Sequence, residues 1–344
     1  MPIKSFSDSS AVSVAYALGD GATAADFAAV NFNLLPFTTE GFQMQKDPKM
    51  STAITNDRRP QGSKNTKGSA KGAVTVEFGA TPFVRDLLSL ALMNDWTPVD
   101  AADATKGTFL LDGDIKKFMA VEKTTKGGPL ATDKLFHERY YGTAVNDMSL
   151  EFKDGDLITM ALNTISTFAD FNSAAAGANG LGGSIAKAKV VPAAYEIADS
   201  SNNLKKIVLK DASGVPMEAT FADASLKIEN NVREQSALGS EFAAGVGIGK
   251  VGASLEGEIY FFDQTILAAH MQSKRMSAEL TLETVEGIFT LTLPRLVAQS
   301  PTNNATGENE DYKTKLTLTA ESGEVTINAK KYTCLIAITF KPKV

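Results

Sequence analysis

An alternating run that leads directly into a capped helix constrains the fold of this chain more than any other feature. Between residues 73 and 79, apolar and polar side chains alternate, which predicts a strand with one buried face. Thr81 and Pro82 follow, and this pair favours the N-cap and first turn of a helix. Apolar residues then recur at helical spacing to about Asn94. Further strands are expected at residues 108–111, 117–124, 134–141, 147–152, 157–165 and 205–210, so the sequence predicts a mainly β protein with minor α content.

The second half of the chain repeats this order at the level of pattern. An alternating strand at 224–229 is followed by a polar, Gly-rich excursion and a second alternating strand at 251–260. Asp263 is a plausible N-cap for a short helix to Met271, and strands are expected at 276–284, 288–293, 313–319, 324–328 and 333–340. Sequence identity between the halves is low, and chance could produce such a likeness in any β-rich chain. The shared order of elements favours a repeat, with Val74 aligned on Leu255, Phe78 on Ile259 and Thr81 on Asp263.

Two domains are therefore expected in the 344 residues, a length that suits two units of ordinary size. Residues 172–184 are small and flexible and could not contribute to a core. We place a first domain with an N-terminal arm at 1–171, a linker with a connecting strand at 172–215, and a second domain at 216–344.

Composition restricts the class of protein. Hydrophobic residues make up 43% and charged residues 22%, which argues against global disorder. The formal charge of −6 disfavours wrapping of DNA, because that affinity comes from neutralised phosphates. Cys334 is the single cysteine, so no internal disulfide is possible, and no apolar run is long enough to span a membrane. No signal peptide is recognised, and we expect folding in a reducing cytoplasm.

Residues 46–72 stand out as basic and polar. They hold seven Lys or Arg residues against two Asp residues, together with several Gly and Pro residues. This pattern predicts a long polar loop or an extended hairpin, and such loops are usually functional or disordered. The stretch lacks the interleaved aromatic residues on which single-stranded nucleic acids stack. An arm that binds an acidic surface on another subunit is the favoured interpretation.

The sequence shows no convincing catalytic, metal or cofactor site. His137 and His270 are far apart; we expect His137 at the surface and His270 partly buried or at an interface. Gly247, Gly249 and Gly252 match the dinucleotide fingerprint, but a polar loop precedes them and a strand follows, whereas the fingerprint needs a strand before and a helix after. We therefore predict no enzyme activity, no catalytic residue, no metal and no cofactor.

Several short motifs, in order, resemble the tail tube (major tail) proteins of siphophages, the long-tailed bacteriophages. They cover most of the chain: Asn56-Asp57-Arg58-Arg59, the strand Lys71 to Phe78, Phe83-Val84-Arg85-Asp86-Leu87-Leu88, Trp96, Phe118 to Glu122 and Tyr141 to Leu150, with similar stretches at Ser225 to Asn231 and Gly252 to Asp263. The match is looser after Asn163-Thr164, where the family pattern has a Gly and this chain reads Ile165-Ser166-Thr167.

The resemblance implies two tandem β-sandwich domains, each with a flanking α-helix and a long loop or hairpin. It also implies that subunits join sheets edge to edge into rings, and that stacked rings form a hollow tube for DNA. A two-domain chain needs three subunits for a pseudo-hexameric ring. The expected location is the virion tail, after synthesis in the host cytoplasm. The expected partners are other copies of the chain, a tape measure protein, tail tip and terminator proteins, and phage DNA held transiently without specific binding; no membrane partner is expected.

Within the basic stretch, the contact loop between rings or subunits is expected at Asp57, Arg58, Arg59, Lys64 and Lys67. The alternative to a tail tube is another β-sandwich module of a virion or cell surface, either a capsid-decoration protein or an adhesin-like binding protein.

Overall fold

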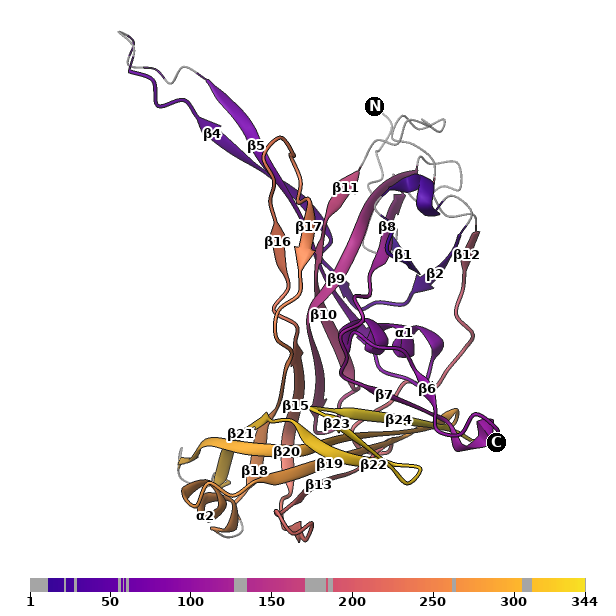
Figure 1. Cartoon of the computed structure of the whole chain (residues 1–344), viewed down its shortest axis with the longest axis vertical. Coiled ribbons are helices and arrows are strands. Elements are labelled where there is room, and N and C mark those ends of the chain that lie inside the picture. Colours follow the sequence, from indigo (N-terminus) through magenta and orange to yellow (C-terminus); the bar gives the residue numbers. More distant parts are fainter. Residues whose placement is uncertain are drawn as a thin grey trace, which may run out of the picture.

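Strands dominate the structure, as the alternating patterns predict, and two α-helices accompany them in the part of the chain that the structure describes (Figure 1). The computed structural model describes residues 12–343 except 22, 28–29, 55–56, 58, 60–61, 127–134, 171–183, 185–187, 262–263 and 305–310. The predicted linker at 172–184 therefore lies outside the described residues except for Ser184. In the described part, no helix is both long and apolar enough to cross a membrane.

The first half of the chain forms one set of strands around α1 (Pro82–Ala91). In the sheet, β3 and β4 pair with β5, β5 with β10, and β10 with the second half of β9. The first half of β9 pairs with β8 and β11, β8 with β1, and β1 with β2. The bounds are β1 Val12–Leu18, β2 Asn31–Leu35, β3 Thr39–Glu40, β4 Gln43–Met50, β5 Ser63–Glu77, β6 Thr97–Pro98, β7 Thr108–Leu111, β8 Met119–Lys126, β9 Leu135–Lys153, β10 Thr159–Ser166, β11 Phe168–Asp170 and β12 Ala188–Val190.

The second half forms a set with the same order of partners around α2 (Thr265–Met271). β15 pairs with β18, β18 with β21, and β21 with the second half of β20. The first half of β20 pairs with β19 and β24, β19 with β13, and β13 with β14. The bounds are β13 Leu204–Lys210, β14 Pro216–Met217, β15 Phe221–Glu229, β16 Arg233–Gln235, β17 Gly245–Gly247, β18 Gly252–Tyr260, β19 Met276–Glu283, β20 Gly287–Asn304, β21 Lys313–Ala320, β22 Gly323–Ile327, β23 Lys330–Cys334 and β24 Ala337–Pro342.

The ends of the elements give the correspondence between the two sets. β5 ends at Glu77 and β18 at Tyr260, after which α1 begins at Pro82 and α2 at Thr265. The residue after each strand also makes the same bond: Phe78 N–H donates to the Ile158 carbonyl, and Phe261 N–H donates to the Tyr312 carbonyl. The sequence alignment placed Val74 on Leu255. The ends of the strands instead place each residue of the first set on a residue two positions later in the second set than that alignment did.

The two sets share one sheet, because β15 pairs antiparallel with the second half of β9. Leu226 of β15 lies opposite Leu150 of β9, and both are fully buried. The main apolar core runs through both sets, with Leu87 and Leu88 of α1 in the first and Phe289 in the second. Thr81 accepts a hydrogen bond from the Val84 N–H at 3.3 Å, so the predicted N-cap of α1 is confirmed.

Some local predictions need correction. The expected strands at 134–141 and 147–152 are one strand, β9, because Gly142 at φ 54° and a register shift let it continue. Asp263 lies outside the described residues; Gln264 holds the N-cap position of α2 and makes no side-chain cap bond. The prediction for the basic stretch is confirmed in its second form, because this stretch forms the extended hairpin β4–β5, which projects away from the rest of the chain (Figure 1).

Candidate functional site: open sheet edges and a basic hairpin arm

The row of strands that runs from β3 and β4 through the joint of β9 and β15 to β20 ends, among the described residues, in an open edge on each side. On one side, β3 and β4 pair only with β5 among the described residues. On the other side, residues 297–304 of β20 pair with β21 alone in the described part of the chain. The corresponding strands inside the molecule, β15 and the second half of β9, are paired with each other. Each open edge is thus the counterpart of an edge that is already joined within the chain.

The first open edge is closed locally by side chains of its own chain. Gly41 N–H donates to the Ala73 carbonyl of β5, so the N–H and carbonyl of the next residue, Phe42, point to the open side. Glu40 accepts a hydrogen bond from the Phe42 N–H at 3.2 Å, and Lys123 Nζ donates to the Phe42 carbonyl at 3.5 Å. Glu40 and Lys123 form an ion pair of 2.7 Å, with side chains only 14% and 16% exposed.

The second open edge is irregular. The register of β20 against β21 shifts between Gln299 and Thr302, and Pro301 in this bulge has no N–H to offer a partner strand. Bulges, prolines and inward-pointing charges are the usual means by which proteins prevent uncontrolled pairing at an edge. Both open edges therefore carry features that restrict pairing.

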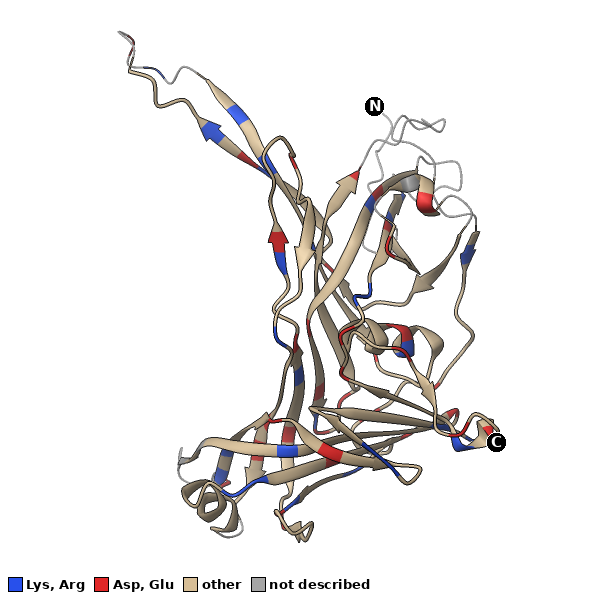
Figure 2. Ribbon diagram, viewed as in Figure 1, with Lys and Arg blue, Asp and Glu red and all other residues tan. Residues whose placement is uncertain are grey.

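The first arm, which we define as residues 43–72 of the β4–β5 hairpin, is basic on both strands (Figure 2). Of the predicted contact residues, Lys64 and Lys67 lie on β5, while Asp57 and Arg59 lie in the connection at the tip. Arg58 lies outside the described residues. Ile54 in the same connection is fully exposed and Met50 is 56% exposed, a pair of apolar tip residues that the charge pattern did not single out.

The second arm, residues 233–247 of the β16–β17 hairpin, packs against the base of the first. Gly68 N–H donates to the Glu241 carbonyl at 2.8 Å, and Lys46 pairs with the Glu241 carboxylate at 2.6 Å. Lys67 pairs with Glu234 at 3.1 Å. A Cβ at Gly68 would lie 2.7 Å from the ring of Phe242, so glycine permits this close approach. Lys67 is thus committed to a contact within the chain.

The solvent-facing side of the shared sheet carries a row of carboxylates. Glu77, Thr159, Glu151, Ser225 and Glu256 are successive partners on neighbouring strands, so carboxylates alternate with hydroxyls across the sheet. Ser225 Oγ donates to Glu151 at 2.8 Å. Other charged residues on this face are Asp147, Asp223, Glu229, Glu258, Lys71, Lys153, Lys227, Lys313 and Lys315.

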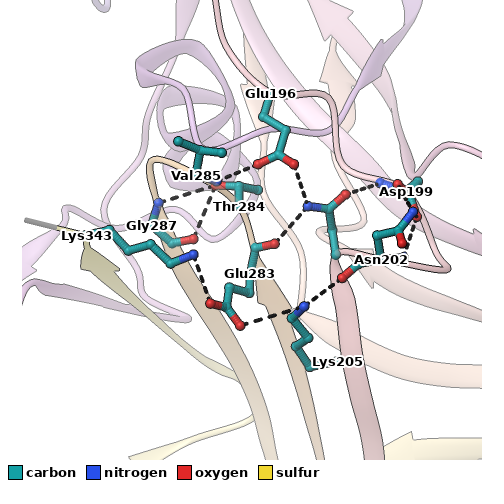
Figure 3. A network of polar contacts seen from close by, with 10 residues as sticks. Glu196, Asp199, Asn202, Lys205, Glu283, Thr284, Val285, Gly287 and Lys343 are labelled. Atoms are coloured by element: carbon teal, nitrogen blue, oxygen red, sulfur yellow. Dashed lines mark hydrogen bonds and ion pairs between the residues drawn. The ribbon is translucent and has the colours of Figure 1, made fainter.

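A polar network fixes the segment before β13 to the turn between β19 and β20 (Figure 3). Glu196 accepts hydrogen bonds from the Val285 N–H and from Asn203 Nδ2, the latter at 3.1 Å. Its own N–H donates to Glu286 at 2.8 Å, and Asn203 also donates to the Glu283 carbonyl at 2.8 Å. This network ties the segment to the second set of strands.

The same segment is bonded to the first set. Ala198 N–H donates to the Phe78 carbonyl at 2.8 Å, and the Ala198 carbonyl accepts from the Ile158 N–H at 2.9 Å. Residues 196–203 therefore join both halves of the molecule.

On the outer side of the network, Lys343 pairs with Glu283 at 2.8 Å, and the hydrogen bond and charge of Lys343 lower the pKa of Glu283.

The two histidines occupy different environments. His137 is buried, and its Nδ1 lies 2.8 Å from Thr124 Oγ1 and 3.5 Å from Glu122; the expectation of a surface position was wrong, because the face of β8 and β9 that carries His137, Thr124 and Glu122 is buried. His270 is partly buried, as expected, and its Nδ1 donates to the Ala298 carbonyl at 2.8 Å. The described residues hold no group of His, Cys, Asp and Glu that could bind a metal ion.

Comparison with known proteins identifies one family. The family model described as phage tail tube protein matches residues 9–322 of the chain. No curated protein matches the sequence. The matched range includes both arms, both open edges and the carboxylate row.

Proposed function

Because the chain belongs to the phage tail tube protein family, we propose that its copies polymerise into stacked rings, which form the hollow tube that delivers phage DNA to the host. The family identifies a structural protein of the phage tail. Ring formation, the number of subunits and the passage of DNA are our proposals.

One observation carries the proposal of rings: the joint between β9 and β15 inside the chain has an open counterpart at each end of the sheet. A contact that joins one edge of a copy to the other edge of the next is heterologous, and it closes into a ring when the rotation fits. We propose that the two sets of strands are two tandem tail-tube domains. Three chains then supply six domains and close a pseudo-hexameric ring.

We propose that the face with the carboxylate row lines the tube. Glu77, Glu151 and Glu256 recur on alternate strands, so a closed ring would repeat these three carboxylates in every copy around its inner circumference. Carboxylates repel the phosphates of DNA, and the duplex could then slide without being retained.

We propose that the tip of the first arm contacts the neighbouring ring. Lys67 and Lys46 pair with carboxylates of the second arm, and the tip of the first arm, which includes Asp57, Arg59 and Ile54, extends beyond the second arm. Arg58 and Lys64 belong to the same proposed contact. Tape measure, tail tip and terminator proteins are the other partners we propose, with assembly in the host cytoplasm and no catalytic role.

Electron microscopy of the purified chain tests the proposal. We expect hollow tubes of uniform width, alone or with a tail-tip initiator complex, and rings whose mass equals three chains. Globular particles under all conditions, with the initiator present, would contradict tube formation. Binding of the single subunits to preformed capsids would instead favour the decoration protein.

A further inference from the structure

The internal joint predicts how two copies meet, residue by residue. In the first set, Gln43 of β4 lies opposite Lys71, just as Lys227 of β15 lies opposite Ser254 in the second set. Lys71 and Ser254 are equivalent, because each lies six residues before the end of its strand, β5 or β18. Gln43 is therefore the counterpart of Lys227.

The other edge follows in the same way. Thr302 of β20 lies opposite Lys315, and Ser149 of β9 lies opposite Ala161. Lys315 and Ala161 are each the third residue of their strands, β21 and β10, which are both eight residues long. Thr302 is therefore the counterpart of Ser149. Inside the chain, Lys227 lies directly opposite Ser149.

Phe42, one residue before Gln43, is the counterpart of Leu226, which lies opposite Leu150 in the internal joint. The backbone groups of Phe42 cannot accept a partner strand while Glu40 and Lys123 occupy them. The counterpart of Glu40 in β15 is Ala224, which has no side chain able to do this. The charged pair is therefore present at the open edge and replaced by a small residue at the joined one.

We propose that β3–β4 of one copy receives the 297–304 edge of β20 from a second copy, antiparallel and with Gln43 opposite Thr302, and that the Glu40–Lys123 ion pair closes this edge until the second copy displaces it. This proposal rests on ring formation, and it adds the register and a regulating latch. This ion pair, which we call the latch, slows the joining of newly made subunits, because each joining step must break one Glu40–Lys123 pair. Nucleation is thereby slower than it would be at an unprotected edge.

Polymerisation kinetics test the latch. Followed by light scattering at one protein concentration, Glu40→Ala and Lys123→Met should each shorten the lag before tube growth, Glu40→Ala by about fivefold, which corresponds to roughly 1 kcal/mol. The matched control is Glu324→Ala, which removes an exposed ion pair of 2.9 Å with Lys331 on the β22–β23 hairpin and should leave the lag unchanged.

Lags of Glu40→Ala and Lys123→Met equal to that of the parent chain would overturn the latch while tube formation stands. Absence of tubes in the parent chain would instead contradict ring formation itself. Should Glu40→Ala misfold, Lys123→Met keeps the test decisive, since it removes the other half of the pair.

Disulfide trapping tests the register. Cysteines at Gln43→Cys and Thr302→Cys should form a bond between copies in assembled tubes, because directly opposite residues on paired strands are close enough for one. Within one chain the two positions lie on opposite edges of the sheet, and the native Cys334 is buried. The control pair Gln43→Cys with Thr290→Cys should not cross-link, since Thr290 is flanked by Thr281 and Thr339. Tubes without the 43–302 bond would overturn the register alone.

Discussion

At the scale of single residues, Thr81 caps the N-terminus of α1, directly after strand β5. Its hydroxyl accepts from the Val84 N–H, and the residue is buried. Thr81→Ala should lower the free energy of unfolding by about 1 kcal/mol, because a helix-start N–H loses its acceptor. Chemical denaturation measures this loss. Thr81→Ser keeps the acceptor and should retain most of the stability; an equal loss in both variants would point to packing of the methyl group.

The buried thiol of Cys334 makes the free energy of unfolding fall as the pH rises into the alkaline range. Burial, with a smaller contribution from Asp112, raises the pKa of its thiol from 9.0 to about 12. The unfolded chain therefore loses this proton first, so the stabilisation is complete below pH 9 and declines as pH rises from 9 towards 12. Tyr141, whose pKa is raised to about 12, adds to the same decline.

Comparison with Cys334→Ala isolates the thiol. The difference in unfolding free energy between parent and variant, measured by urea titration, should move by about 1 kcal/mol in favour of the variant between pH 8 and pH 10. A difference that does not change with pH would show that the thiol titrates alike in both states.

The sequence predicted residue roles where the partners are local, and missed them where the partners are distant. Thr81 needs only Val84, three positions on, so the cap could be recognised. Glu40 depends on Lys123, and His137 on Glu122 and Thr124, through strand pairings that no local pattern reveals. The roles of these residues became visible only with the register of β8 and β9.

At the scale of elements, the first arm is a regular hairpin over most of its length. Met50 lies opposite Ser63, so residues 51–62 form its end connection. Replacing 51–62 by Asn-Gly gives a two-residue turn that suits a hairpin. Under the proposed function, this variant should form rings of normal mass that do not stack.

Analytical ultracentrifugation and negative-stain microscopy distinguish rings from tubes in this arm variant. The control replaces Lys330 and Lys331, at the unrelated β22–β23 hairpin, by Ala and should leave stacking intact. Full-length tubes from the shortened arm would remove it from the contact between rings.

Element predictions succeeded where alternation was strong and failed where a strand changed partners. The strand before α1 and the hairpin character of 46–72 could be read from pattern and charge. β9 runs through two sets of partners, and the interruption at Gly142 made it look like two strands. The second arm has few large apolar residues and no regular alternation, so the sequence indicated only a polar, Gly-rich excursion there.

At the scale of the whole molecule, residues 196–203 hold the halves together. Glu196→Ala removes the acceptor of the Val285 N–H and of Asn203, whose amide is buried. We expect a loss of about 1 kcal/mol in unfolding free energy, the net contribution of a typical hydrogen bond, because the Val285 N–H lies at an exposed turn and Asn203 keeps its bond to the Glu283 carbonyl. Thermal unfolding measures this loss, and Glu218→Ala at an exposed position is the control. A change in Glu196→Ala no greater than in the control would mean that the network adds little to stability.

The pairing of β24 with β7 has a consequence for synthesis. β7, at residues 108–111, lies between α1 and β8, yet its partner on one side is β24, at residues 337–342. The chain leaves the ribosome N-terminus first. β7 therefore cannot pair with β24 until almost the whole chain has been translated. Contacts this distant in sequence form slowly. A chain cut short by a nonsense codon or by premature release would lack this strand, and the defect would reach back into its first half.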